Sequence, residues 1–547
     1  MYFRGMQSLL VLLSVFRMVV LPVQFEDREL ATARAQQEEL VQQAQAYFDR
    51  QFAGSGTTFR FELAPAVTLQ QKAAWYGANY PDRKDVRIGE AVREACTQAQ
   101  GKVDFAACDR DADGKVDNVF LLFAGPGEHE SGVEDDLYPQ QGFLSDAGGT
   151  FTVGGKTVDS YAAAPEGRLG VFCHEFAHAL GLPDLYDTDG ADSGGTARGL
   201  WGTSLMDEGC RRDVPPDFGA LEYELLGLGS CKMLTRGPQV LLPLAEGHSY
   251  LKAATDQEGE FFLFEARGDG LYVYHIDRSD NPAGTSQRQT GELTARGRWE
   301  SGEINNNPDH PCARLVPADP AATDAAGLPF AGGAGFSSDT PAAFRSWDGS
   351  AQGMALTGIR LQEDGSIAFE VLQPLTVAGI TVYQDAAVVN WTPDPALDGI
   401  QGFEIRWTDG GRTDRRELSA QATGCTLEGL RPKTDYTFSI QLRLAGGERY
   451  SADGTFTTKV RHQGTYPYIY LNSATRNVDG TFPPGSKLPL RVFNATDVQE
   501  VRWSLDGIPL VPEADGGFTL QRGGMLRARI LHTDGTSETL IKEIIVQ

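Results

Sequence analysis

The feature that most constrains this chain is a short apolar helix that has to end in a sharp reversal. Residues 169–180 carry the apolar periodicity of a helix, and Gly181 followed by Pro183 ends it. His174 and His178 are four residues apart, so both side chains leave the same face of the helix. Glycine can reverse the chain without a Cβ clash, and the turn then returns Asp184 towards the two imidazoles. The fold has to support this helix and the turn behind it.

The donors in this segment are those of a catalytic zinc site. Two imidazoles at this spacing hold one Zn²⁺ at about 2.0–2.1 Å, and catalytic zinc usually takes three protein ligands and one water. We predict His174, His178 and Asp184 as the zinc ligands, with Asp187 as the alternative third ligand. Glu175 is predicted to take a proton from the water and to return it to the leaving amine.

The alternative interpretation is a surface helix that carries two solvated histidines. The chain has only eight histidines, and the helix around His174 and His178 is otherwise apolar. A buried polar side chain needs a partner, and a metal ion supplies one. The pattern therefore favours the metal site.

The spacing from His174 to Asp184 resembles that of the metzincin clan, with aspartate in place of the more frequent third histidine. Met206 is then predicted as the Met-turn residue, an apolar floor under the metal. Residues 174–187 resemble, more specifically, the immune inhibitor A-like family of secreted bacterial metallopeptidases. The resemblance spans residues 18–370 and is supported at residues 23–27, 47–48, 75–77, 109–117, 124–127 and 270–277.

This resemblance implies a metzincin-like catalytic domain, endopeptidase activity on proteins, catalytic Zn²⁺ and structural Ca²⁺. The sequence departs from the family pattern in two ways. It leaves almost no room for an inhibitory pro-segment before the first strand. Many metzincins have tyrosine two residues after the Met-turn methionine, where this chain has Glu208. The group that stabilises the oxyanion is therefore open; Tyr186 is a candidate, and packing is its alternative role.

An acidic loop resembles the front of a calcium site, because hard oxygen ligands alternate around a glycine. Its carboxylates are Asp109, Asp111, Asp113 and Asp117. Phe120 occupies the position where an EF-hand needs glutamate, so a complete EF-hand is excluded. The alternative is a solvated acidic turn. A second calcium site is an open guess at Asp187, Asp189 and Asp192, since these residues also simply favour turns.

With 547 residues the chain is too long for one core and predicts several domains. The predicted fold class is an α/β (α+β) metzincin-like zincin domain with a β-rich extension, followed by two β-sandwich domains. Trp391, Trp407 and residues 430–436 resemble a fibronectin type III domain, and Trp503 is the predicted core tryptophan of the last unit. The predicted segments are an export signal at 1–17, then 18–245, 246–373, 374–460 and 461–547.

Apolar runs predict buried strands at residues 18–25, 119–124, 261–267 and 270–277. Pro22 favours an edge position for the first of these strands. Helix formers predict helices at residues 29–52 and 86–99. His275, Asp277 and His310 are expected to be structural hydrogen-bond partners, and Cys173 is expected to be a core residue.

Composition excludes several classes of protein. The net charge of -26 disfavours nucleic acid and anionic membranes as partners. Seven cysteines without a CxxC pair argue against a disulfide scaffold and a cysteine zinc ribbon, and a Cys210–Cys231 bridge is unsupported. No stretch after the amino terminus reaches the length of a membrane helix.

The sequence thus predicts a secreted or cell-surface bacterial zinc endopeptidase that acts on protein or glycoprotein substrates. Two alternatives stay open. One is a non-catalytic adhesion protein with a degenerate peptidase domain. The other is a peptidase restricted to glycoproteins, in which the carboxyl-terminal sandwiches contact glycan or a surface.

Overall fold

The computed structural model describes residues 14–80, 83–286, 292–459, 466–471, 473, 475–477, 480–513 and 516–547. They divide into two compact units. The first spans the chain up to Leu234 together with Val240–Ala331 and Arg360–Ala368, and the second comprises Thr235–Gln239, Gly332–Ile359 and Phe369–Gln547. Most of the predicted export signal lies outside the described residues, but Ser14–Arg17 belong to the first strand. The domain boundaries predicted from the sequence stay predictions.

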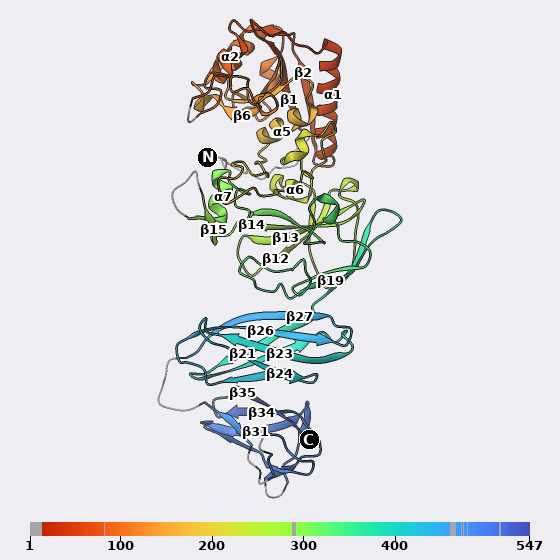
Figure 1. Cartoon of the computed structure of the whole chain (residues 1–547), viewed down its shortest axis with the longest axis vertical. Helices are drawn as coiled ribbons and strands as arrows, with labels where there is room; N and C mark the ends of the chain where they lie inside the picture. Colours follow the sequence, from red (N-terminus) through yellow and green to blue (C-terminus); the bar gives the residue numbers. More distant parts are fainter. Residues whose placement is uncertain are drawn as a thin grey trace. The chain divides into compact units, whose positions relative to one another are not determined.

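The first unit begins with a mainly parallel sheet between two helical layers (Figure 1). The sheet has the order β2-β1-β5-β9-β6, β3 also pairs with β1, and β6 is the antiparallel edge strand. Its strands are β1 (Ser14–Gln24), β2 (Thr57–Leu63), β3 (Val67–Thr68), β5 (Val119–Phe123), β6 (Gln140–Phe143) and β9 (Ser160–Pro165). A small sheet contains β4 (Lys115–Val116), β7 (Phe151–Val153) and β8 (Lys156–Val158).

The two faces of this sheet are covered by different helices. Alternate side chains of β1, such as Met18 and Val20, pack with α1 (Arg34–Gln51) and α5 (Leu169–Ala179). The intervening side chains, such as Val19 and Leu21, pack with α3 (Ile88–Ala99). Because both faces are buried, the central strands read as continuous apolar runs. The remaining short helices of this part are α2 (Ala73–Tyr76) and α4 (Glu128–Ser131).

The prediction that Pro22 marks an edge strand is wrong, because β1 is paired on both sides. The backbone oxygens of Val20 and Gln24 accept from Ala64 and Leu69, so the backbone of Pro22 points to the same side. On that side the pairing with β2 ends at Val20 and the pairing with β3 resumes only at Val23. The missing N–H of proline therefore faces a gap in the partner strand.

Helix α1 begins later than the sequence predicts. The residues before it are bound instead by Glu166, whose carboxylate accepts the N–H groups of Ala31 and Thr32 at 2.8 and 2.7 Å. Thr32 also donates its hydroxyl to the same carboxylate. These backbone groups are fixed in extended chain, so the helix begins at Arg34.

A second, mainly antiparallel sheet of the first unit has the order β10-β12-β13-β14-β17. The predicted strands at 261–267 and 270–277 are confirmed as β13 and β14. The elements are α6 (Ala220–Leu226), β10 (Ser230–Met233), β12 (Ser249–Ala254), β13 (Glu260–Arg267), β14 (Gly270–Asp277), β15 (Pro282–Thr285), β16 (Glu292–Thr294), α7 (Ala295–Ser301) and β17 (Ala313–Val316). A further sheet has the order β11-β20-β19-β18, with β11 (Gly237–Leu241), β18 (Ala334–Ser337), β19 (Ala355–Leu361) and β20 (Ile367–Leu372).

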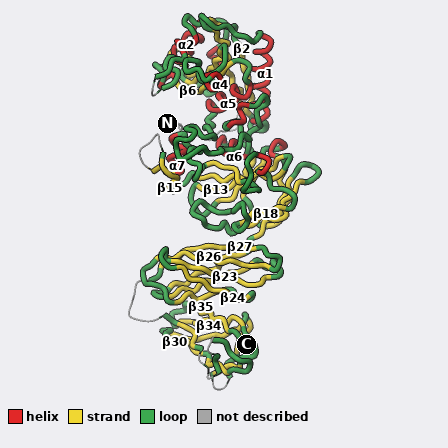
Figure 2. The backbone as a smooth tube through the Cα atoms, in the orientation of Figure 1, coloured by secondary structure: helices red, strands yellow, loops and turns green. Residues whose placement is uncertain are grey.

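The second unit is built almost entirely from strands (Figure 2). Its central part pairs β21-β22-β25 in one sheet and β24-β23-β26-β27 in another. Trp391 and Trp407 are buried between them, and the Tyr436 hydroxyl accepts the N–H of Arg431 at 2.9 Å, which closes the predicted turn. The strands are β21 (Leu375–Val382), β22 (Ala386–Pro393), β23 (Ile400–Thr408), β24 (Thr413–Ser419), β25 (Gly424–Glu428), β26 (Asp435–Leu444) and β27 (Arg449–Thr457).

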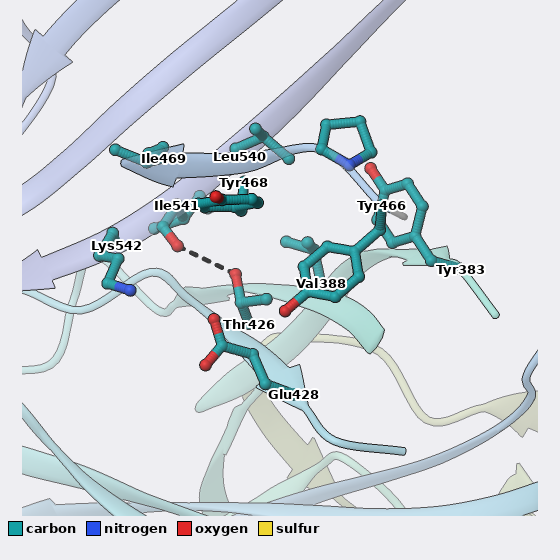
Figure 3. Close-up of a pocket in the computed structure, with 11 residues that line it drawn as sticks. Tyr383, Val388, Thr426, Glu428, Tyr466, Tyr468, Ile469, Leu540, Ile541 and Lys542 are labelled. Carbon is teal, nitrogen blue, oxygen red and sulfur yellow. Dashed lines mark hydrogen bonds between the residues drawn. The ribbon is translucent and has the colours of Figure 1, made fainter. Parts of the chain in front are cut away.

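The last part of the chain forms small sheets around a core that contains Trp503. Figure 3 shows the shallow pocket where β25 and β35 meet, lined by Tyr383, Tyr466 and Tyr468, with Thr426 donating to the backbone oxygen of Ile541. The strands are β28 (Tyr468–Tyr470), β29 (Lys487–Pro489), β30 (Arg491–Phe493), β31 (Val498–Leu505), β32 (Ile508–Leu510), β33 (Gly517–Thr519), β34 (Gly524–His532) and β35 (Ser537–Ile544).

All seven cysteines are free thiols, including Cys210 and Cys231. Cys173 is buried in the core, as predicted. None of the helices in the described part of the chain combines the length and the apolar character that crossing a membrane requires.

Candidate active site

Helix α5 ends in a geometry that returns the chain to its own last turn. Gly181 has φ +104°, a left-handed conformation that favours glycine. The N–H of Gly181 donates to His178 O at 2.9 Å, and the N–H of Leu182 donates to Ala177 O at 3.2 Å. These two bonds form a Schellman motif, which satisfies helix carbonyls and redirects the chain. The reversal brings Asp184 against the face that carries both histidines.

Three electron-pair donors converge at this point. Asp184 Oδ1 lies 3.1 Å from His174 Nε2 and 3.2 Å from His178 Nε2. The two Nε2 atoms are 3.1 Å apart. Four ligand atoms at tetrahedral positions about 2.0–2.1 Å from a zinc ion are about 3.3 Å apart, so the three donors have nearly the required spacing.

The other nitrogen of each imidazole faces a backbone carbonyl. His174 Nδ1 lies 2.9 Å from Leu205 O, and His178 Nδ1 lies 2.7 Å from Leu182 O. A carbonyl only accepts, so each Nδ1 carries the proton and each Nε2 presents a lone pair. Two such lone pairs and a carboxylate oxygen repel one another unless a cation lies among them. The donor set therefore fits a metal ion, and its chemistry fits Zn²⁺.

The carboxylate of Glu175 is buried beside these donors. Burial raises the pKa of Glu175 to about 7, although the neighbouring His174 and His178 oppose the shift. Within the described residues this carboxylate forms no hydrogen bond. A carboxyl group whose pKa lies near neutrality can both accept and return a proton.

Asp184 and its sequence alternative Asp187 have different environments. Burial opposes ionisation of Asp184, but the two adjacent imidazoles hold its pKa well below the ordinary value. Asp187 instead binds backbone N–H groups of its own loop, at Asp189, Gly190 and Ala197. The structure therefore brings Asp184, and not Asp187, to the two histidines.

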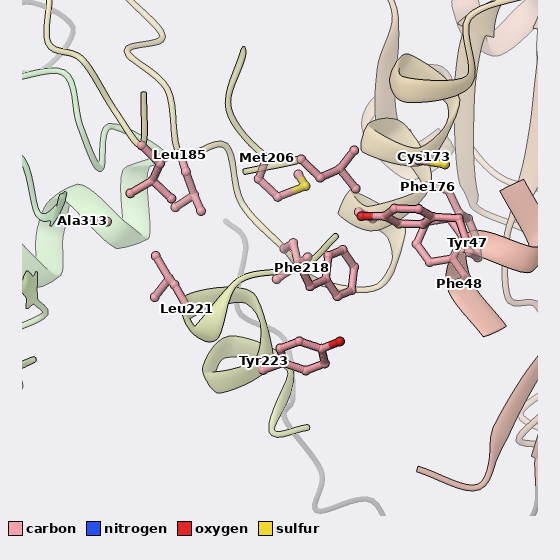
Figure 4. Packing of buried hydrophobic residues seen from close by; sticks show 14 of the residues in the cluster. Tyr47, Phe48, Cys173, Phe176, Leu185, Met206, Phe218, Leu221, Tyr223 and Ala313 are labelled. Atoms are coloured by element: carbon pink, nitrogen blue, oxygen red, sulfur yellow. The ribbon is translucent and has the colours of Figure 1, made fainter. Parts of the chain in front are cut away.

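The loop that contains Met206 lies against the helix and the turn. Met206 is fully buried, and its backbone oxygen accepts the N–H of Leu185 at 2.8 Å. Figure 4 places Met206 in one packed cluster with Cys173, Phe176 and Tyr47. These contacts agree with the predicted apolar floor, whose function stays a prediction.

The buried hydroxyl of Ser204 and the buried carboxylate of Glu222 hold the loop that contains Met206 in place. The Ser204 hydroxyl donates to Glu222 and accepts the N–H of Met206 at 3.0 Å. Glu222 also accepts the N–H of Gly219 at 3.0 Å. Burial raises the pKa of Glu222. This network holds the backbone on both sides of Leu205, whose carbonyl orients His174.

We expect Ser204→Ala to weaken zinc binding by about 10–100-fold, the usual effect of losing an outer-shell contact to a ligand histidine. The change removes the partner of a buried carboxylate and releases the Leu205 carbonyl. Competition with a chromophoric chelator measures the zinc affinity. Ser193→Ala is the matched control, because Ser193 also donates to a carboxylate, that of Asp189, but has no contact with the histidines. Equal zinc affinity in the two variants would contradict the assignment.

Two tyrosines lie near the donors. Tyr186 is a candidate from the sequence, whereas Tyr138 is not predicted by it. The Tyr186 ring lies 6.3 Å from the His174 ring, so the candidate oxyanion tyrosine is at the site. Burial raises the pKa of Tyr138, and the carboxylates of Glu175 and Asp184 add to the shift, so this phenol lies within their electrostatic range. The sequence could have indicated Tyr138, because it follows the parallel strand β5, which pairs with β9, the strand just before α5. Glu208 forms an ion pair with Arg211 at 3.0 Å.

Only some of the predicted carboxylates of the acidic loop lie close together. Asp109, Asp111 and Asp113 have carboxylate oxygens close enough to share one cation. Asp117 lies outside this group and accepts the N–H of Arg110 at 3.1 Å, so the structure brings together three of the four predicted carboxylates, and the calcium site stays a prediction. Lys156 Nζ lies 2.6 Å from Asp109 Oδ2 and already supplies a positive charge.

The other candidate residues bind protein side chains in the described part of the chain. His275 Nε2 lies 2.6 Å from Glu260 Oε1, and His310 Nε2 lies 2.8 Å from Asp277 Oδ2. Asp189 accepts the hydroxyl of Ser193 at 2.6 Å. Asp187, Asp189 and Asp192 are not among the clusters of the described residues that could hold a metal.

Comparison with known families agrees with this geometry. Residues 24–213 match the family model "Immune inhibitor A peptidase M6, catalytic domain". The chain thus contains a peptidase M6 (immune inhibitor A) catalytic domain. Residues 372–457 match the fibronectin type III domain, which confirms the sandwich predicted from Trp391, Trp407 and residues 430–436. The M6 domain thus contains all three converging donors.

Curated relatives match this chain over a limited length. "Pre-pro-metalloprotease PrtV" of Vibrio cholerae is 29% identical over 172 residues, which cover 26% of this chain and 19% of that protein. "Immune inhibitor A" of Bacillus thuringiensis is 26% identical over 174 residues, which cover 26% of this chain and 25% of that protein. A solved structure of the fn3 domain of human collagen alpha-1(XX) chain is 26% identical, with a TM-score of 0.15, and covers 17% of this chain and 86% of that one. The matched part spans a quarter or less of these curated relatives.

Proposed function

We propose that this chain is a secreted zinc endopeptidase that hydrolyses peptide bonds of extracellular proteins. One observation carries the proposal: two imidazole nitrogens and a carboxylate oxygen converge within 3.1–3.2 Å, beside a buried glutamate. The family of residues 24–213 supports a metalloprotease. Export is proposed from the apolar amino-terminal run and from the pre-pro form that the name of the Vibrio relative describes.

His174, His178 and Asp184 would hold the zinc ion. When bound, a zinc ion would polarise the scissile carbonyl and acidify the attacking water. Glu175 takes the proton of the attacking water on a carboxylate oxygen and then delivers it to the nitrogen of the leaving amine. Leu205 O and Leu182 O keep both imidazoles in the tautomer whose Nε2 can bind metal.

We assign the catalytic architecture to the metzincin type. The support is the helix–glycine–aspartate order and the buried methionine loop behind it. The strands after β27 are proposed to complete an Ig-like sandwich. We do not propose structural calcium at the acidic loop, because Lys156 already balances the charge of Asp109 there.

Casein hydrolysis with and without a zinc chelator tests this function. We expect cleavage by the purified chain, loss of cleavage with 1,10-phenanthroline, and recovery when excess zinc is returned. Elemental analysis before and after chelation links the activity to the metal. Cleavage that persists in fully zinc-free protein would refute the proposal. A zinc-free chain that cleaves neither casein nor glycosylated substrates would instead favour the adhesion alternative.

A further inference from the structure

The turn that carries Asp184 is anchored by a residue far beyond the segment that matches the M6 model. Asn305 is fully buried in the connection between α7 and β17. Its Nδ2 donates to Leu185 O at 2.8 Å, across 120 residues of chain. Its Oδ1 accepts the N–H of Ala313, the first residue of β17, at 2.9 Å. One side chain therefore joins the second sheet to the residue that follows Asp184.

Both backbone polar groups of Leu185 are used in this way. Its N–H donates to Met206 O at 2.8 Å, while its carbonyl accepts from Asn305. The chain after Asp184 is thus held on both sides of the Leu185 Cα, by the methionine loop and by the second sheet. Leu185 directly follows Asp184, so its position restricts where the Asp184 carboxylate can point.

The neighbouring amide extends the anchor along the same loop. Asn306 is fully buried, and its Oδ1 accepts the N–H of Thr188 at 3.0 Å and the hydroxyl of Thr188 at 3.1 Å. Consecutive asparagines therefore bind the chain one and four residues after Asp184. Asn307, the next residue, donates instead to Ala283 O at 3.0 Å and does not touch this loop.

We propose that Asn305, supported by Asn306, is a positioning residue for the third zinc ligand, so that the catalytic centre includes the second sheet and does not end with the family-matched domain at residue 213. The inference rests on the proposed zinc function of Asp184. It predicts that the amide contributes to the metal site and not only to folding. A buried amide that bridges two elements would otherwise affect stability alone.

The experiment compares Asn305→Ala, Asn306→Ala and the matched control Asn307→Ala in the full chain. Zinc affinity is measured by competition with a chromophoric chelator, and the ligand geometry is followed by the visible absorption of the cobalt-substituted protein. We expect Asn305→Ala to weaken zinc binding by about 10–100-fold and to alter the cobalt spectrum. Asn306→Ala should change both in the same direction by less, and Asn307→Ala should match the wild type.

Unchanged zinc affinity and an unchanged cobalt spectrum in Asn305→Ala, with only a lower melting temperature, would overturn the inference and leave Asn305 a purely structural residue. If Asn305→Ala fails to fold, Asn306→Ala decides, because its contacts to the same loop are fewer. A wild-type chain that binds no zinc would refute the proposed function itself, so the two failures are distinguishable.

Discussion

Glu175→Ala is expected to lower kcat/KM by about 10²–10⁴-fold or more, the range attributed to a positioned acid–base group, while the zinc content stays unchanged. Glu175 lies next to His174 on α5 but is not among the converging donors, so its removal leaves the metal ligands in place. Cleavage of a quenched fluorescent peptide measures the rate, and elemental analysis measures zinc. Glu175→Gln, which keeps the shape but cannot take a proton, should be equally impaired.

Glu38→Gln provides the control for a change of charge. Glu38 is exposed on α1 and pairs with Arg34 at 2.9 Å, so its loss should leave the rate unchanged. A Glu175→Ala variant that keeps more than about a tenth of wild-type activity would contradict the role of general base.

Asp184→Asn is expected to weaken zinc binding by more than about 100-fold, because the loss of a direct ligand exceeds the effect of losing an outer-shell contact. The change removes the negative charge that faces His174 Nε2 and His178 Nε2 at 3.1 and 3.2 Å. Peptide cleavage should fall in parallel and recover partly at high zinc concentration. The dissociation constant for zinc is the deciding measurement.

Asp187→Asn separates the two aspartates that the sequence leaves open. Asp187 binds backbone groups of its own loop and lies outside the three converging donors, so this variant should change zinc affinity by less than tenfold. Strong loss of zinc in Asp187→Asn with little loss in Asp184→Asn would transfer the third ligand to Asp187 and contradict the geometry described above.

The local parts of this site could be predicted from the sequence. The i, i+4 spacing of His174 and His178 fixes a shared helix face, and glycine at position 181 fixes the reversal, since both depend on neighbouring residues only. The apolar runs of β5, β13 and β14 were identifiable for the same reason. The family resemblance extended this local pattern to a catalytic domain.

The parts that depend on distant chain segments could not be predicted. Asn305 lies in a polar loop, and nothing near it in the sequence indicates that its amide reaches Leu185. The bond from Ser204 to Glu222 likewise forms only after the methionine loop packs on α6. Pro22 led to the wrong prediction of an edge strand, because the gap in its partner strand is a property of the folded sheet.

X-ray absorption at the zinc edge of the purified chain tests the central claim most directly. We expect one zinc per chain with only nitrogen and oxygen ligands, at about 2.0–2.1 Å. We also expect this signal to be lost in Asp184→Asn at limiting zinc. A zinc-free protein, or a sulfur ligand at about 2.3 Å, would contradict the site formed by His174, His178 and Asp184.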